Sequence, residues 1–462
     1  MKILPVTQFN IVNFRANTKE TAHQIPKKEV GIVGGVATVA LVAGGLAYKH
    51  QTDYLRILAK DLSKELSKKI SSKDLKCVMT KQEMLKELPK LSEQNYVASA
   101  ENIKNGIFQA DLHSHSNYSD GLISVANLLE EAANYGDKLN KINGKKFIFA
   151  LSDHDGVEGV KEALKIIAQN PKKFENVKFV PASEVSFIFP CQKNSARFKR
   201  FHSEVQMPEM LVFGLNPFSK NTHDFFNSIY EARQQQIFSA MNKSCFYYHT
   251  GNFDNLEYRK FYTNPDKKLC FLNQHWKIWN YIHTKSRVVQ MAHEQGKDAN
   301  QLYAEIMTNL KADNKQLTPY ELSEYIKRNN IQTQSSEIDV KLKKILEEEI
   351  FPQKIDENTS SSSYEKTIDD KIKYAKNEGA TLGFAHPAFT MQNMDKDKSF
   401  DIMKNIVKKS HGCIKFAEKH HQAYPVGKEI SEVELKEYNE ILDKLNLINI
   451  GGRDNHSNVF IK

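Results

Sequence analysis

The chain has 462 residues, 40% of them hydrophobic and 26% charged, which excludes a largely disordered protein and leaves room for two or three globular domains. Its formal net charge of +9 favours anionic substrates, but the sequence shows no basic run with interleaved aromatic residues that would indicate a nucleic-acid-binding segment. The five cysteines are far apart and form no Cys-x-x-Cys pair, which excludes a disulfide framework and indicates a reducing compartment.

The N-terminal residues form a separate region. Residues 1–28 are polar and irregular, and residues 30–48 are an uncharged apolar run flanked by basic residues. A run of that length can span a bilayer, so we predict a single transmembrane helix over residues 29–48. A signal peptide or a buried glycine-rich segment is the alternative. Basic residues are balanced on the two sides and do not indicate an orientation. The cysteine pattern favours a cytoplasmic catalytic domain on a membrane anchor.

Two further regions are predicted to be helical. Apolar residues recur at helical spacing from Tyr54 to Ile70, so residues 49–105 are expected to form a helical stalk. Residues 219–363 are too long for a plain loop and are predicted to form a helical insertion subdomain. Its aromatic residues, such as Trp276 and Trp279, would form the core of that subdomain or stack on a base.

Residues of the types that bind metals follow five strand-like apolar stretches. His113 and His115 follow the first stretch and share one face of it, and Asp120 lies in the next turn. Chemistry gathers at the carboxyl ends of strands in α/β proteins, so such residues are expected to meet in one pocket. The sequence therefore predicts a multinuclear metal centre. The other four stretches end in Asp153-His154-Asp155, in Glu184, in His386 and in Asp454-Asn455-His456.

These five clusters, in this order, resemble the motifs of the PHP (polymerase and histidinol phosphatase) superfamily of metal-dependent phosphoesterases. The resemblance implies an α/β fold, a distorted TIM-like (β/α)7 barrel, whose two parts are residues 106–218 and 364–462. It also implies up to three divalent ions. The implied ligands are His113, His115, Glu184 and Asp454 for one ion, Asp120, His154 and His456 for another, and His386 with the bridging Glu184 for the third.

One ligand position departs from the family pattern. The family usually has a histidine three residues before the glycine of the strand that follows the glutamate motif, and here that residue is Leu211. Glu209 on the same strand face and His202 and Glu204 upstream are the alternatives that the sequence leaves open. The resemblance thus implies two or three ions. Histidine with carboxylate suits manganese, zinc or iron better than calcium or magnesium.

Further residues are expected around the ions. Asp153 and Asp155 flank His154 and are predicted to orient a neighbouring imidazole. Arg453 is predicted to bind a substrate phosphate through its guanidinium group. Charged loops are usually solvated surface, which is the alternative for the remaining basic residues. Those further candidates for phosphate binding are Arg197, Lys199, Arg200 and Lys419.

The sequence therefore predicts an enzyme that hydrolyses phosphate esters. Closely spaced divalent ions neutralise the charge of such esters and activate water, and the resemblance implies attack by a metal-bound hydroxide. The expected substrates are small phosphorylated molecules, namely nucleotides or short oligonucleotides, which also favour the cytoplasmic side for the catalytic domain. A 5′-to-3′ exonuclease acting on single strands is one alternative. A catalytically weakened regulatory domain that binds metal or nucleotide is another, and Leu211 is the feature that favours it.

Overall fold

The computed structural model describes only part of the chain, and all of the described residues belong to the second of two compact units, His50–Lys462. The predicted transmembrane segment, Arg197, Lys199 and Arg200 lie outside the described residues. No helix within the described part is long and apolar enough to cross a membrane. The described residues are 53–93, 97–98, 100–105, 108–121, 123–187, 189–190, 205–206, 208–232, 275–310, 317, 319–331, 368–394, 396–421 and 430–456.

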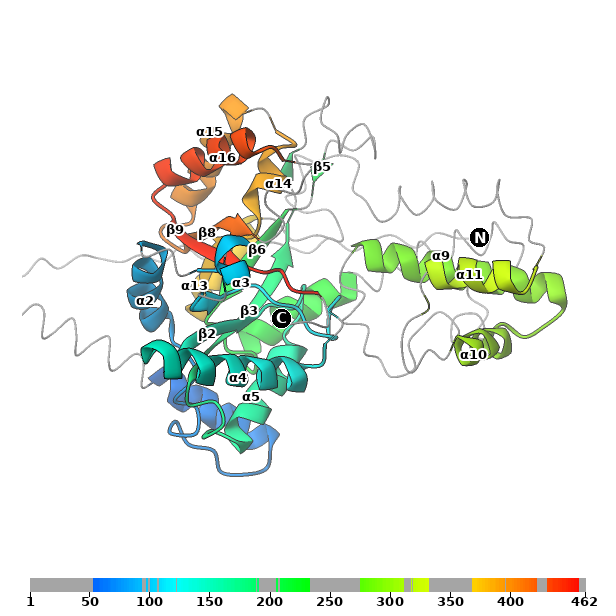
Figure 1. Ribbon diagram of the computed structural model, residues 1–462, viewed down its shortest axis with the longest axis horizontal. Helices are drawn as coiled ribbons and strands as arrows, with labels where there is room; N and C mark the ends of the chain where they lie inside the picture. Colours follow the sequence, from blue (N-terminus) through cyan, green and yellow to red (C-terminus); the bar gives the residue numbers. More distant parts are fainter. Residues whose placement is uncertain are drawn as a thin grey trace, which may run out of the picture. The chain divides into compact units, whose positions relative to one another are not determined.

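The centre of this unit is a seven-stranded sheet in the order β1-β2-β3-β6-β7-β8-β9 (Figure 1). Its two outer strands meet, because the Leu112 N–H donates to the Gly451 carbonyl at 3.3 Å and the His115 N–H donates to the Asn455 carbonyl at 3.2 Å. The sheet is therefore nearly closed into a barrel. Its parallel strands are β1 (Ala110–Asp111), β2 (Phe147–Leu151) and β3 (Val177–Ser186) on one side and β7 (Thr381–Phe384), β8 (Ile414–His421) and β9 (Ile448–Gly452) on the other.

Strand β6 (Glu209–Phe213) runs antiparallel to both of its neighbours, β3 and β7. The chain reaches it from β3 through a small antiparallel ribbon of β4 (Phe189–Pro190) and β5 (Val205–Gln206). Such a ribbon turns the chain back on itself, whereas a parallel strand needs a long crossover connection. The first residue of β6 therefore lies at the edge of the sheet where the parallel strands end.

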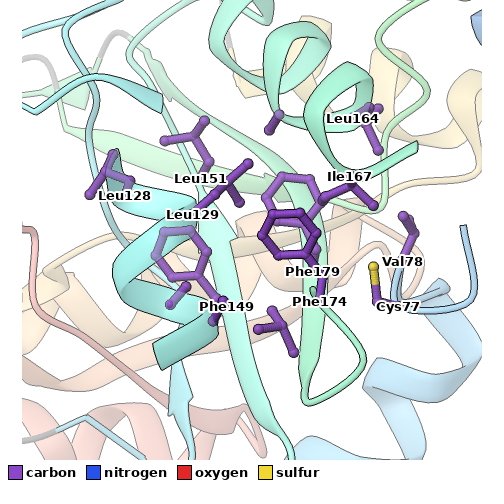
Figure 2. Close-up of a cluster of buried hydrophobic side chains, with 14 of the residues drawn as sticks. Cys77, Val78, Leu128, Leu129, Phe149, Leu151, Leu164, Ile167, Phe174 and Phe179 are labelled. Atoms are coloured by element: carbon purple, nitrogen blue, oxygen red, sulfur yellow. The ribbon is translucent and has the colours of Figure 1, made fainter. Parts of the chain in front are cut away.

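Helices α4 (Val125–Asn143) and α5 (Glu158–Gln169) pack together beside β2 and β3. Helix α4 begins where the Ser124 hydroxyl accepts the Asn127 N–H, and it ends at Gly144, whose φ of 69° is readily adopted by glycine. Figure 2 shows the core beneath these helices, where Leu128 and Leu129 of α4 meet Leu164 and Ile167 of α5 and the phenylalanines of the sheet.

A second core lies against β6, β7 and β8. Tyr374, Phe384 and Tyr438 are buried in it. One of its helices, α16, begins with a capping box formed by the Ser431 hydroxyl and the Glu434 carboxylate. The helices on this side are α13 (Ile368–Glu378), α14 (Pro387–Met391), α15 (Lys396–Lys409) and α16 (Glu432–Lys444).

Residues 53–93 differ from the predicted stalk, because they pack into the α/β unit. A helix over residues 53–65 buries Leu58 and Leu62 in the core of Figure 2, and the Tyr54 hydroxyl donates to the Leu215 carbonyl at 3.0 Å. Helix α2 (Lys81–Glu93) contributes Met84 and Leu88 to the buried interior of the barrel, and α3 (Ala100–Asn105) follows it. Helical spacing reveals an apolar stripe, but it does not say what covers that stripe.

The described part of the predicted insertion is helical. Helices α10 (Ala299–Asn309) and α11 (Pro319–Arg328) each pack against α9 (His275–Gln295). Trp276 and Trp279, which were considered for base stacking, lie in α9, and their side chains are not among those that the structure describes.

Candidate metal centre

The residues predicted to bind metal come together at the edge of the sheet where the parallel strands end. All of them except His386, together with Glu209, form three groups, in each of which the candidate ligand atoms lie within 4.8 Å of one another. His115, His154 and Glu184 each belong to two groups. The groups are His113, His115, Glu184 and Asp454; His115, Asp120, His154 and His456; and His154, Glu184 and Glu209.

The first group is the most deeply buried. Glu184 Oε2 lies 3.0 Å from His113 Nε2 and 3.3 Å from His115 Nε2. Asp454 Oδ1 lies 3.5 Å and 3.0 Å from the same two nitrogen atoms. Two imidazoles and two carboxylates around one point match the ligand types and the number that a divalent transition metal takes.

The second group lies around Asp120. Asp120 Oδ2 is 3.0 Å from His456 Nε2 and 3.6 Å from His154 Nε2. The ring of His115 stacks between the rings of His154 and His456, with both centroid distances 4.4 Å. A neutral imidazole offers a lone pair on one nitrogen only. If His115 Nε2 serves the first group, its Nδ1–H donates to the Ser119 hydroxyl at 3.3 Å, and the second group consists of Asp120, His154 and His456.

The same rule applies to His154 and decides the third group. With the Nε2 lone pair toward Asp120, a neutral His154 has no second lone pair on Nδ1, the atom that lies 3.2 Å from Glu184 and 3.4 Å from Glu209. His386 Nε2 lies 3.1 Å from Glu184 Oε1 and 3.4 Å from Glu209 Oε2. If His154 serves the second group, the third candidate set is Glu184 and Glu209 together with the neighbouring His386.

Glu209 reaches the centre because of the direction of its strand. Leu211 pairs with Glu184 in the β3–β6 register and is fully buried in the apolar interior of the barrel. Glu209 lies two residues before Leu211 and therefore on the same face of the strand. Because β6 is antiparallel to its neighbours, this earlier residue lies nearer to the metal centre. Of the alternatives that the sequence left open, Glu209 is in the centre, and His202 and Glu204 lie outside the described residues.

The centre attracts positive charge. Burial lowers the pKa of its imidazoles, but the neighbouring carboxylates outweigh this effect and raise the pKa of His115 to about 10 and those of His154 and His386 to about 9. Burial would raise the pKa of the Asp120 carboxyl, but the His154 imidazole and its neighbours hold that pKa far below the usual range. Protons and divalent cations therefore compete for the same atoms.

The donor atoms also fit a shared cation. His115 Nε2 and Glu184 Oε2 are buried and only 3.3 Å apart, yet neither forms a hydrogen bond. Buried polar atoms are normally hydrogen-bonded, and atoms that face a common point without bonding to one another are what a metal site requires. The residues present thus fit divalent ions.

Asp153 and Asp155 hold backbone segments of the centre. Asp153 accepts the Ser116 N–H and the Ser119 hydroxyl, both at 2.7 Å, and so fixes the turn that leads to Asp120. Asp155 Oδ1 accepts the Ser186 N–H at 3.2 Å, at the end of the strand that carries Glu184. Both carboxylates thus hold backbone segments next to the candidate ligands. A role in orienting an imidazole stays a prediction.

Arg453 and Lys419 both form ion pairs. The Arg453 Nε donates to Asp111 Oδ2 at 2.5 Å, its backbone N–H donates to Asp111 Oδ1, and the side chain is only 3% exposed. This pair ties the residue after β9 to β1 and helps to close the barrel. Lys419 pairs with Asp443 of α16. Phosphate binding by these two residues stays a prediction.

Strand β8 and its residue Glu418 were not predicted from the sequence. This fully buried carboxylate contacts His113 Nδ1, and it accepts the His386 N–H. The strand was missed because Lys415, Glu418 and Lys419 interrupt its apolar pattern. The available signal was the alternation of Ile414, Phe416 and Glu418, which places a carboxylate on an otherwise apolar strand face.

Comparisons with known proteins gave likenesses in structure only. No protein-family model matches the chain, and no curated protein does. An amidohydrolase from Chromobacterium violaceum, solved with bound sulfate and no metal, is 15% identical with a TM-score of 0.39, over 76% of this chain and 88% of its own. A candidate metal-dependent phosphoesterase from Bifidobacterium adolescentis is 14% identical with a TM-score of 0.38, over 75% and 87%. At such low identities and TM-scores, any functional assignment depends on the residues of the centre.

Proposed function

We propose that the protein is a metal-dependent phosphoesterase. The observation that supports this most is the three overlapping groups of imidazole and carboxylate ligands at one edge of the barrel. Glu184 belongs to two of these groups and would hold neighbouring ions, which would supply charge neutralisation for a phosphoryl group. The sequence motifs that carry the resemblance to the PHP superfamily supply nearly all of these ligands.

Divalent ions at these positions supply neutralisation of the phosphate charge and a bound water of lowered pKa. The residues of the chain hold and orient them. Without ions, the protonated imidazoles only offset the carboxylates of the centre and leave no net positive charge for an anionic substrate, so phosphate binding should depend on metal. Phosphate binding that requires metal would distinguish this proposal from phosphate binding by basic side chains alone, which needs no metal.

The third ion is held, in this proposal, by Glu184, Glu209 and His386. Two of its three ligands are carboxylates, so this position favours manganese or iron over zinc more strongly than the first group does. The variant Glu209→Gln should bind one ion fewer than the unchanged protein, as measured by elemental analysis after gel filtration. An unchanged ion count in a folded Glu209→Gln protein would remove Glu209 from the ligand set.

The proposed substrates are nucleotides or short oligonucleotides, because the net charge of +9 favours anions and the motif wording resembles that branch of the superfamily. The test is hydrolysis of an aryl phosphate and a nucleotide panel by the full chain, after chelation and after return of manganese, zinc or iron. Glu184→Gln is the inactive variant. Glu378→Gln is the matched control, because Glu378 accepts the Asn216 N–H and the Ser219 hydroxyl outside the centre. Metal binding without hydrolysis of any ester would contradict the proposal and favour a regulatory binding domain.

We also propose that residues 30–48 anchor the protein to a membrane, with the catalytic unit on the cytoplasmic side. The support is the length and the apolar composition of this run. Fractionation of cells that express the full chain tests it, with a variant lacking residues 1–49 as the control. Recovery of the full chain in the fraction extracted by salt alone would contradict a membrane-spanning anchor.

A further inference from the structure

One buried carboxylate contacts two of the candidate ligands from different strands. His113 Nδ1 lies 3.1 Å from both carboxylate oxygens of Glu418, and the His386 backbone N–H donates to Glu418 Oε2 at 2.8 Å. His113 follows β1 and His386 follows β7, so Glu418 of β8 joins two segments that are far apart in the sequence. Its side chain is fully buried.

The local backbone directs Glu418 to this place and leaves room for it. The β8–β9 register shifts between Glu418 and His420, an irregularity of the kind that re-aims a side chain. On the facing strand, a Cβ atom at Gly452 would lie 2.1 Å from Glu418 Oε1 and 2.4 Å from the Cβ of His113. Only glycine at position 452 therefore allows Glu418 and His113 to meet as they do.

The contact with His113 fixes which nitrogen of the ring faces the metal position. A carboxylate accepts hydrogen bonds only, so His113 must carry its proton on Nδ1 when it contacts Glu418. The lone pair is then on Nε2, the atom 3.0 Å from Glu184 and 3.5 Å from Asp454. A carboxylate behind a metal-binding imidazole sets the tautomer and raises the basicity of the ligand.

The contact with His386 stabilises an unusual backbone conformation. His386 has φ 24° and ψ 56°, in a region that strains the backbone of non-glycine residues. A hydrogen bond from its N–H to a charged carboxylate is stronger than one to a neutral acceptor and offsets that strain. Its ring can then reach Glu184 and Glu209 from the end of β7.

We propose that Glu418 is a positioning residue that orients His113 and His386 together and so couples the first and third ion positions. This inference rests on the proposed function, in that it requires the centre to bind divalent ions. It adds a residue that contacts no ion and no substrate. Its loss should therefore change metal affinity at two positions at once.

The test is the variant Glu418→Gln in the full chain. An amide that turned its NH2 toward His113 would donate to Nδ1 and leave the proton on Nε2, the wrong tautomer for metal binding. If the amide turned the other way, its NH2 would face the His386 N–H. Two donors would then face each other, and the hydrogen bond from His386 would be lost. Either way, we expect manganese affinity to fall about 10- to 100-fold, as measured by competition with a chelator, and the visible spectrum of the cobalt-loaded protein to change. A purely structural role would lower the melting temperature and leave the affinity and spectrum of the folded protein unchanged.

Two further variants keep the test decisive. Glu378→Gln also weakens a carboxylate that accepts a backbone N–H, and it should leave metal affinity and the cobalt spectrum unchanged. If Glu418→Gln does not fold, Glu418→Asp replaces it, because the shorter side chain keeps the charge but cannot reach both partners. Unchanged metal affinity in a folded Glu418 variant would overturn the positioning role of Glu418 but would leave the proposed function standing. Absence of metal binding in the unchanged protein would overturn the proposed function as well, so the two failures are distinguishable.

Discussion

Loading the metal-free protein with divalent ions should release protons. The pKa of His115 is raised to about 10 and those of His154 and His386 to about 9, and the pKa of His113 is also raised well above its usual value. Burial opposes these shifts, and the surrounding carboxylates outweigh it. At pH 7.5 the rings of His115, His154 and His386 therefore carry a second proton that must leave before they can bind metal, and the pKa of His113 is shifted in the same direction. Filling the centre should release about three to four protons per chain.

Isothermal titration with manganese in buffers of different ionisation enthalpy measures this number. The slope of the observed heat against the buffer ionisation enthalpy gives the protons released. Apparent affinity should rise with pH between about 7 and 9, by up to tenfold per pH unit for each proton displaced. The variant His115→Asn, which has no imidazole to protonate, should release about one proton fewer.

A slope of zero at pH 7.5 would refute the electrostatic reasoning. It would mean that the imidazoles are already neutral in the metal-free protein and that the carboxylates do not dominate the centre. Proton release that is undiminished in His115→Asn would exclude His115 as one of the protonated rings. Either result leaves the question of ion number to elemental analysis.

Further expected outcomes concern stability and the turn before Asp120. In the metal-free protein the raised pKa of His115 contributes stability that is complete below about pH 6.5 and is lost as pH rises toward 10, so its melting temperature should fall over that range. The lowered pKa of Asp120 has the opposite sign, and its contribution should be lost as pH falls below about 4. Phe179→Ala, at a fully buried position, should cost about 3–5 kcal/mol in urea unfolding, whereas Val433→Ala, at an exposed one, should change stability by less than about 0.5 kcal/mol. Asp153→Asn should weaken binding of the ion at Asp120 about 10-fold, measured by chelator competition, and unchanged affinity would show that the turn holds its shape without Asp153.

Much of the candidate centre can be read from the sequence, because each ligand is encoded locally. An apolar run followed by His113 and His115, or by His154, indicates both a buried strand and the end at which its polar residues emerge. The rule that strand ends gather at one edge then predicts that such residues meet. The structure brings most of these residues together by distance, and its three groups include Glu209 and not His386.

The sequence could not predict the direction of β6 or the existence of β8. Strand direction depends on which partners a strand pairs with, and those partners are far away in the chain. That direction brings Glu209 to the centre and leaves Leu211 in the apolar interior. Charged residues in β8 hid the strand and, with it, the contact of Glu418 with His113.

The sequence alone thus determined the types of ligand, their order and the α/β character of the fold, since all three follow from patterns within a few residues. Only the tertiary structure decided which carboxylate lies beside Glu184 and His154, what covers the apolar face of residues 53–93, and which carboxylate contacts His113 Nδ1. Periodicity tells which face of an element is buried. What that face meets depends on hydrogen-bond pairing and packing between segments that are hundreds of residues apart.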